Sequence, residues 1–331
     1  MNTKIVDHLT DLSRLFNVNP ARANEALNAQ TLSGLQVSFE FFPPKTLEAD
    51  AALSEVSSKL ATLRPKFMTV TYGAGGTTKT KTHETAVAMQ RATGIPIAAH
   101  LTCVGAPKSE INAVADAFWN DGIRHIVALR GDMPGGAPYV PHPDGYPYTS
   151  FLIEGLKKLH NFEISVAAYP EKHPDAPSLD SDIDALKKKI DAGADRAISQ
   201  FFFEPVTFLR FVEKARARGI DKPIVPGILP IHNFSQVIKF AQQCGTKIPD
   251  HMYSTFKALD QDPETRKLVS AITAAEQCKV LHAMGVRHFH FYTLNKADLV
   301  YAVCHMLGLR AGGETASSAT ELAPARAGAI G

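Results

Sequence analysis

The chain has 331 residues, 45% apolar and 21% charged, which is the composition of an ordinary globular protein with enough apolar material for one large core. Its formal net charge of +2 is too weak to argue for binding to nucleic acid. No apolar run approaches the length of a membrane-spanning helix, and the opening residues lack the unbroken apolar segment of a signal peptide.

The four cysteines, Cys103, Cys244, Cys278 and Cys304, are far apart in the sequence and form no C-x-x-C motif. This spacing favours reduced thiols over disulfides or zinc ligands. We therefore expect a cytoplasmic protein.

Residues 1–36 predict an N-terminal helical extension. After them, a short β-rich apolar run is followed by a longer helical stretch, and this unit recurs along the chain. The eight runs are residues 37–42, 68–72, 97–103, 125–129, 165–169, 197–203, 224–229 and 288–294. Most of them start about 27 to 40 residues apart, which predicts parallel strands joined by helical crossovers.

Glycines stand just before several of these runs, where the preceding helix would end. They are Gly94, Gly122, Gly193, Gly219 and Gly285. Glycine readily takes the left-handed conformation that closes a helix, so these positions predict helix ends followed by strands.

Eight strand-helix units favour a single (β/α)8 TIM barrel over residues 1–310, with residues 311–331 as a disordered tail poor in groups to bury. An open, doubly wound sheet is the structural alternative. No G-x-G-x-x-G motif opens a helix after the first strand, which weakens a dinucleotide-binding Rossmann fold. The interval from Ile224 to His288 is about twice the others, and Pro249 and Pro263 punctuate it, so we expect one or two extra helices there.

The active site of such a barrel lies at the carboxyl ends of its strands. The polar residues predicted there are Glu40, Thr71, His100, Thr102, Arg130, Asp132, Tyr169, Glu171, His173, Gln200, Tyr292 and Asn295. Glu40 stands among Phe39, Phe41 and Phe42. Desolvation by these rings would raise its carboxyl pKa and suit a general acid. A structural ion pair with Arg130 is the alternative interpretation.

Asp132 follows Gly131, and glycine at a strand end lets backbone approach a ligand closely, although an Asx-turn or helix cap explains the pattern equally well. His100 and His173 lack the H-x-x-x-H or clustered carboxylate spacing of a metal site, so we expect no metal and interpret them as hydrogen-bonding histidines. These patterns alone predict a barrel enzyme with a polar mouth and no particular substrate.

At these residues the sequence resembles the methylenetetrahydrofolate reductase family, in its short bacterial type without a regulatory domain. The matching segments are residues 39–44 (FEFFPP), 70–74 (VTYGA), 99–103 (AHLTC), 129–132 (LRGD), 169–174 (YPEKHP), 198–203 (ISQFFF), 227–230 (GILP) and 289–295 (FHFYTLN). They occur in the family's order over roughly residues 37–309.

The resemblance implies a (β/α)8 barrel with non-covalent FAD, which NADH or NADPH reduces in a ping-pong cycle. The substrate would be 5,10-methylenetetrahydrofolate and the product 5-methyltetrahydrofolate, in the one-carbon metabolism that supplies methionine synthesis. Glu40 would be the general acid that protonates N10, and Asp132 the carboxylate beside flavin and pterin. The family also suggests a homo-oligomer.

Further residues match ligand-contacting positions of the family. For FAD these are Thr71, Tyr72, Ala74, His100, Arg130, Gly131, Asp132, Tyr148, Thr149, Tyr169, His173, Ala176, Asp182, Lys188 and Lys189. For folate or nicotinamide they are Gln200, Gln236, Phe240, Leu294 and Lys296.

Several positions depart from the family's pattern. The stretch 133–147 is longer and rich in proline and glycine, Ala185 replaces a hydrogen-bonding residue, and Lys188 and Lys296 replace arginines. Lysine keeps the charge but loses the bidentate fork of arginine, which puts affinity at those points in doubt.

Two other functions fit a barrel of this kind. One is a flavin-free lyase or aldolase with a lysine Schiff base, for which Lys45 and Lys66 lie near the first two strands but not at apolar strand ends. The other is a non-catalytic ligand-binding barrel. The sequence does not distinguish NADH from NADPH.

Overall fold

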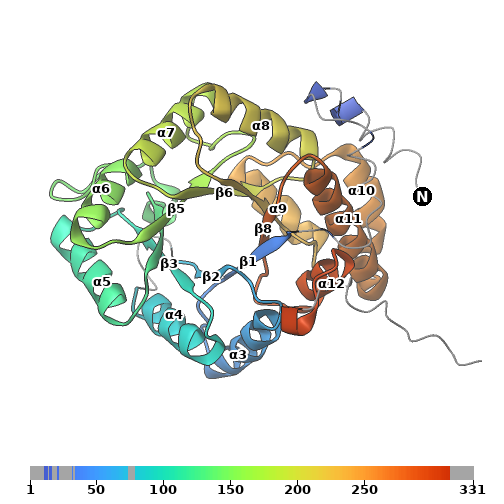
Figure 1. Cartoon of the computed structure of the whole chain (residues 1–331), viewed down its shortest axis with the longest axis horizontal. Coiled ribbons are helices and arrows are strands. Elements are labelled where there is room, and N and C mark those ends of the chain that lie inside the picture. The colour runs from blue at the N-terminus through green and yellow to red at the C-terminus, as the bar shows by residue number, and fades with distance from the viewer. Residues whose placement is uncertain are drawn as a thin grey trace, which may run out of the picture.

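A computed structural model describes residues 11–13, 15, 16, 21, 32, 34–73 and 79–313. Over this part of the chain, parallel strands pair in sequence order and close into a barrel of eight, β8 pairing with β1 (Figure 1). The strands are β1 (Gln36–Phe41), β2 (Phe67–Val70), β3 (Ile97–Thr102), β4 (His125–Leu129), β5 (Glu163–Ala168), β6 (Arg196–Phe201), β7 (Ile224–Ile228) and β8 (His288–Tyr292). The predicted TIM barrel is confirmed.

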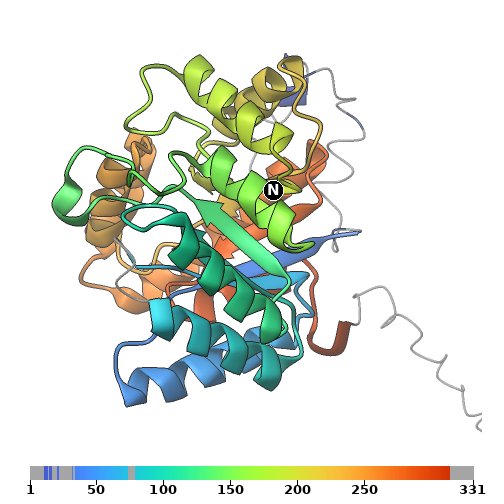
Figure 2. The same ribbon diagram turned by 90° about the vertical axis from the view of Figure 1, so that its left-hand side faces the viewer.

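Helices pack around the outside of the barrel, as the side view shows (Figure 2). They are α3 (Leu47–Ala61), α4 (Lys79–Thr93), α5 (Lys108–Asn120), α6 (Thr149–Leu159), α7 (Leu179–Asp191), α8 (Pro205–Ala217), α9 (Phe234–Cys244), α10 (Asp250–Phe256), α11 (Pro263–Ala283) and α12 (Asp298–Met306). Short 3-10 turns are η2 (Pro134–Gly136), η3 (Lys257–Leu259) and η4 (Ala311–Gly313). None of these helices is long and apolar enough to cross a membrane.

Local sequence signals set many of the helix boundaries. Ser178 forms a capping box with Ser181 at the start of α7, and Asn233 caps α9 by accepting from the backbone N–H of Gln236. The glycines predicted to close helices all have positive φ, between 69° at Gly94 and 114° at Gly193. The interval between Ile224 and His288 holds α9, α10 and α11, so α9 and α10 are the extra helices expected there beside one crossover helix.

Alternation along the strands divides the core into two layers. Phe39, Phe41, Phe289 and Phe291 face outward and join the large core formed with the helices. A smaller cluster, with Phe67 at its centre, fills the barrel interior. The interior also carries polar side chains, and those at the carboxyl ends of the strands face the barrel mouth.

The two ends of the chain are only partly described. Leu12, in a helical stretch within the expected N-terminal extension, packs with Val280 and Ala283 of α11. The expected C-terminal tail begins with η4, and its residues 314–331 lie outside the described part of the chain.

Candidate active site at the barrel mouth

Glu40 lies near the carboxyl end of β1. Its side chain is surrounded by polar groups of β2, β3 and β8. Its Oε2 is 3.5 Å from His100 Nε2 on β3 and 3.7 Å from His290 Nε2 on β8. Thr69 Oγ1, on β2, donates to the same oxygen at 3.4 Å. Both imidazole nitrogens are buried and have no hydrogen-bond partner among the described residues. Two unpartnered ring nitrogens thus face one carboxylate oxygen.

The pKa of Glu40 is low in this arrangement. Burial raises the pKa, but hydrogen bonding and charge from His100 and His290 outweigh it and lower the pKa from 4.5 to about 2. The two N···O distances are longer than ordinary hydrogen bonds, so the lowering reflects the approach of two polar rings more than two formed bonds. Burial thus acts in the direction expected from the sequence, but the expected net rise of this carboxyl pKa is wrong.

The phenylalanines beside Glu40 do not enclose its carboxyl group. Phe39 and Phe41 point to the helical layer, because neighbouring residues of a strand face opposite sides of the sheet. Phe42 follows the strand and is 44% exposed. The polar environment of Glu40 therefore comes from β2, β3 and β8, and not from its neighbours in the sequence.

Arg130 is not the partner of Glu40. Its Nη2 lies 2.7 Å from Asp175 Oδ2, and its guanidinium lies 4.8 Å from the ring centre of Tyr139. Tyr139 belongs to the long loop after β4, and Asp175 to the loop after β5. The ion pair considered from sequence is thus wrong, and Arg130 instead connects two loops beside the mouth.

Gly131 has a backbone conformation and surroundings that exclude larger residues. Its φ is +84°, and a Cβ atom added there would lie 2.5 Å from Val104 Cγ1 and 2.8 Å from Thr102 Cβ. The next residue, Asp132, is exposed, and its charge raises the pKa of both Tyr169 and Cys244, in each case after burial as the larger cause. Protein atoms therefore crowd Gly131, and the close approach of its backbone to a ligand stays a prediction.

The described residues expected to contact FAD lie on β3, on the loops after β2, β4 and β5, at the start of α6 and on α7. Tyr148 precedes α6 as its N-cap and is 58% exposed, and Thr149 begins that helix. The backbone N–H of Thr71 donates to Phe41 O, and half-buried Tyr72 follows it. Ala74 lies outside the described residues.

The loop after β5 is tied to the start of α7. Asp182 accepts from the backbone N–H of His173 at 2.9 Å, and the rings of Tyr169 and His173 meet edge to face at 4.7 Å. His173 O accepts from the backbone N–H of Ala176 at 2.9 Å. Lys172 stands in this loop at φ 138°, a conformation that favours glycine, and its amine donates to Pro174 O and Ala176 O. These bonds hold one preformed loop at the mouth.

Lys188 and Lys189 do not share one basic face. Lys188 and Ala185 are exposed, whereas Lys189 Nζ donates to Ala167 O at the end of β5, 2.6 Å away. Burial lowers the pKa of Lys189 to about 8, against the opposing effect of Asp182. Consecutive helix residues point in different directions, so only one of the two lysines turns towards the barrel.

Gln200, near the end of β6, has a local hydrogen-bond partner at each end of its amide. Its Oε1 accepts from the backbone N–H of Phe201 at 2.9 Å, and its Nε2 donates to Cys244 Sγ at 3.2 Å. Tyr292 lies across the mouth and donates to Ser199 O. A ligand bound by the Gln200 amide would have to displace these local partners.

The other residues expected to contact folate or nicotinamide surround this side of the mouth. Gln236 is exposed in the first turn of α9, and half-buried Phe240 lies one turn further, against a cluster that contains Phe201. Leu294, at φ 50°, and exposed Lys296 follow β8.

Sequence analysis missed Ser38, Thr69, His290 and Cys244 as members of this region. Alternation was an available signal, since Ser38 and Glu40 are two residues apart on β1, and His288, His290 and Tyr292 alternate with phenylalanines on β8. That pattern places the polar side chains on the inner side of the barrel. No local signal marks Cys244.

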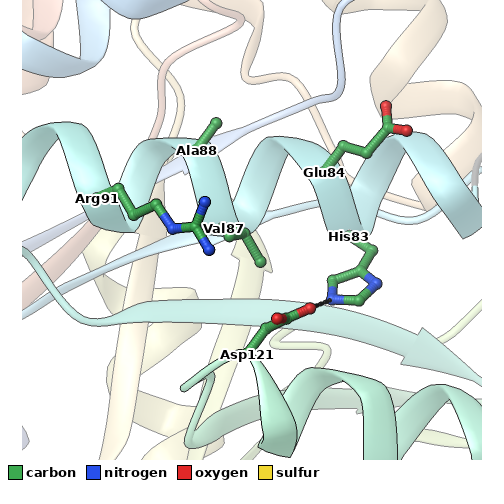
Figure 3. A pocket seen from close by; sticks show the side chains of 6 residues that line it. All are labelled: His83, Glu84, Val87, Ala88, Arg91 and Asp121. Atoms are coloured by element: carbon green, nitrogen blue, oxygen red, sulfur yellow. Dashed lines mark ion pairs between the residues drawn. The ribbon is translucent and has the colours of Figure 1, made fainter.

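A cavity of about 340 Å³ lies elsewhere, on the outer surface between α4 and the end of α5 (Figure 3). His83 and Asp121 form an ion pair across it at 2.8 Å, and Glu84, Val87, Ala88 and Arg91 complete its lining. It is an open depression away from the strand ends, so its size does not make it the active site.

Comparison with known proteins agrees with this geometry. A profile of the family described as methylenetetrahydrofolate reductase matches residues 26–308. The 5,10-methylenetetrahydrofolate reductases of Salmonella typhimurium and Escherichia coli are each 48% identical to the chain over 297 residues, which cover 88% of this chain and 98% of those proteins. Methylenetetrahydrofolate reductase (NADH) 1 of Arabidopsis thaliana is 37% identical over 284 residues, with 82% of this chain and 48% of that protein covered.

Among solved structures, a Clostridium thermocellum protein described as binding two copies of 5-methyl-5,6,7,8-tetrahydrofolic acid superposes with a TM-score of 0.54. The match covers 86% of this chain and 96% of that chain, at 12% identity, and therefore supports the fold alone. The family match and the identities over most of the sequence go further: the chain belongs to the methylenetetrahydrofolate reductase family.

Proposed function

We propose that the protein reduces 5,10-methylenetetrahydrofolate to 5-methyltetrahydrofolate with NADH or NADPH, in a ping-pong cycle through non-covalently bound FAD. The observation that carries the proposal is the carboxylate of Glu40 in the barrel mouth, faced by the ring nitrogens of His100 and His290. Family membership supports the reaction, and the name of the Arabidopsis relative favours NADH.

The described residues fit FAD at the loops after β4 and β5. Gly131 leaves backbone without a side chain at a strand end, in a cradle that a Cβ atom would fill. Lys189 offers a buried amine, and Arg130 offers a guanidinium beside the ring of Tyr139. The phosphates of FAD would find cationic partners there, and its rings would find an aromatic one. FAD supplies a two-electron carrier that accepts hydride from one ligand and donates it to the next.

Glu40 is the group that moves a proton in this proposal. It would protonate N10 of the folate as the five-membered ring opens, which leaves the N5 iminium as hydride acceptor. In the ligand-free protein its low pKa keeps the carboxyl ionised near neutral pH. A pterin over the mouth would remove water from the carboxylate, and this desolvation would raise its pKa towards that of a working acid.

Asp132 and Gln200 would orient the folate and stabilise its charge. Asp132 is exposed at the mouth, where a carboxylate can accept hydrogen bonds from a pterin and lower the energy of a cationic iminium. Gln200 has an amide with both donors and an acceptor, which suits a pocket that receives nicotinamide and folate in turn. Gln236, Phe240, Leu294 and Lys296 would complete that pocket.

The two lysines considered for the competing lyase function do not fit it. Lys45 and Lys66 are both exposed, whereas a Schiff-base lysine needs an environment that lowers its amine pKa. We further propose a cytoplasmic homo-oligomer, a location consistent with the free thiols of all four cysteines.

The spectrum of the purified protein tests the proposal. It should show an oxidised-flavin spectrum that NADH or NADPH bleaches anaerobically, and methylenetetrahydrofolate should restore the oxidised spectrum. Titration with each nicotinamide decides the preferred reductant. A colourless protein that binds no added FAD would overturn the proposal.

A further inference from the structure

A line of polar groups runs through the barrel interior from Glu40 towards the amino-terminal ends of the strands, with hydrogen bonds from His290 onward and a 3.7 Å contact between His290 and Glu40. His290 Nδ1 lies 2.8 Å from Ser38 Oγ, and the same oxygen lies 3.0 Å from His288 Nε2. His290 and Ser38 have no exposed surface, whereas His288, at the start of β8, is only partly buried. These groups thus link the partly buried carboxylate of Glu40 to the opposite end of the barrel.

The hydrogen-bond donors of His288, Ser38 and His290 can all point the same way. A neutral imidazole has one N–H and one acceptor nitrogen. If the N–H of His290 is on Nε2, facing the carboxylate of Glu40, its Nδ1 accepts from the hydroxyl of Ser38. The Ser38 oxygen then accepts from the Nε2–H of His288. Each donor therefore points towards Glu40.

A second buried histidine belongs to a different arrangement. His125 Nε2 lies 2.7 Å from Ser165 Oγ and 3.3 Å from Arg196 Nη1. A guanidinium only donates, so this nitrogen must accept and cannot pass a proton onward. Phe67 packs against the rings of His125, His288 and His290 and separates the two groups.

We propose that Glu40 is reprotonated from the amino-terminal end of the barrel, through His288, Ser38 and His290. This inference rests on the proposed role of Glu40 as general acid. In the ligand-free protein the carboxyl is ionised, so the proton arrives after folate covers the mouth, when that side is closed to water. The opposite end of the barrel is then the available source.

One proton moves at each step of the transfer, and no net charge is left behind. An acid in the solvent protonates the free ring nitrogen of His288, and the Nε2 proton of His288 moves to Ser38. The hydroxyl proton of Ser38 moves to His290 Nδ1, and the Nε2 proton of His290 moves to Glu40 Oε2. His288 ends neutral, and the solvent acid has lost the proton that Glu40 gains. Once product leaves, the open mouth lets the tautomers re-equilibrate.

The surroundings of His288 keep it neutral between transfers. Burial, and then the charges of His290, Lys66 and Arg196, lower its pKa to about 3. A ring that returns to the neutral form passes a proton on and does not store it. Transfer from His290 Nε2 to Glu40 Oε2 requires their 3.7 Å separation to shorten to a hydrogen bond.

The matched variants are His288→Gln and His125→Gln in the FAD-loaded enzyme. His288→Gln keeps a donor near Ser38 but cannot relay a proton. We expect it to lower kcat for methylenetetrahydrofolate reduction about tenfold or more, with little change in KM or in flavin reduction by NADH, and with a larger solvent isotope effect. His125→Gln should keep wild-type kcat. Equal kcat and isotope effect in His288→Gln and wild type would overturn the relay, as would an equal loss in both variants.

A second measurement needs no activity. Nitrogen-15 NMR of histidine-labelled protein without cofactor should show the Nε2–H tautomer at both His288 and His290, and Ser38→Ala should change the tautomer balance of His290. An Nδ1–H tautomer at His290 in the wild type would overturn the direction of the chain. Absence of reductase activity in the wild type would contradict the proposed function instead, and the NMR result would still decide whether the directed chain exists.

Discussion

Arg130 and Asp175 form an ion pair at 2.7 Å, and this pair joins the loop after β4 to the loop after β5. Tyr139, in the loop after β4, packs against the Arg130 guanidinium, with its ring centre 4.8 Å away. The arrangement positions Arg130 and its neighbour Gly131 beside the loop that carries Tyr169 and His173. The two loops proposed to hold FAD are thus connected before any ligand is present.

Asp175→Asn should weaken FAD binding modestly. Asp175 is 61% exposed, and exposed ion pairs contribute about 0–1 kcal/mol, so we expect the Kd for FAD to rise at most about fivefold. Quenching of flavin fluorescence measures this Kd. Asp191→Asn, which removes the partner of Lys187 on the outside of α7, is the control and should leave the Kd unchanged. A similar Kd in both variants would show that the loop connection does not matter for binding.

Gly131→Ala should destabilise the protein and impair FAD binding. The new Cβ would overlap Val104 and Thr102, and overpacking of this kind costs about 1–3 kcal/mol, in addition to the cost of a positive φ. Gly135→Ala is a control in the same loop, because its φ is also positive but no atom lies within 4 Å of the added Cβ. Urea unfolding of both variants measures the difference. Equal stability would mean that the backbone at Gly131 shifts to make room.

Glu40→Gln should separate the two half-reactions. The amide keeps the size of the side chain but has no proton to transfer. Flavin reduction by NADH should continue, while methylenetetrahydrofolate reduction falls by about 10²-fold or more. Stopped-flow spectroscopy measures each half-reaction. Loss of both half-reactions together would assign Glu40 a structural role, and near-normal folate turnover would exclude it as the acid.

The acid sensitivity of folding should also depend on Glu40. Its folded pKa, about 2, is below the ordinary value of 4.5, so the carboxylate stabilises the folded state above pH 4.5 and loses this contribution as the pH falls towards 2. The stability difference between wild type and Glu40→Gln should shrink over that range, by about 1.4 kcal/mol for each unit of lowered pKa. Urea unfolding at several pH values measures it. A difference that does not change with pH would contradict the low pKa.

Gln200→Ala should weaken folate binding by about 1–3 kcal/mol, the usual cost of an unpaired buried polar group on the ligand. The nicotinamide half-reaction should also slow, while FAD content stays full. Cys244→Ser retains a hydrogen-bonding partner for the Gln200 amide and serves as the control, with folate affinity close to wild type. Folate affinity and rates in Gln200→Ala equal to those of wild type would place Gln200 outside the shared pocket.

The sequence by itself determined the barrel and the chain positions of most polar residues at its mouth. Strand and helix periodicity, and helix ends such as Gly94 and Gly193, are local properties, because they depend on backbone conformation over a few residues. The family segments were recognisable for the same reason. The addition of α9 and α10 to the last interval was also predictable from its length and from Pro249 and Pro263.

Only the tertiary structure decided which groups meet. Glu40 faces His290, 250 residues later in the chain, because β8 closes the barrel against β1 in a fixed register. The same closure turns Phe39 and Phe41 outward and leaves Arg130 to pair with Asp175. The pKa of a carboxyl group depends on the charges and donors within a few ångströms of it. Those neighbours are set by strand pairing between distant segments, and so the direction of the Glu40 pKa shift could not be derived from the residues beside it in the sequence.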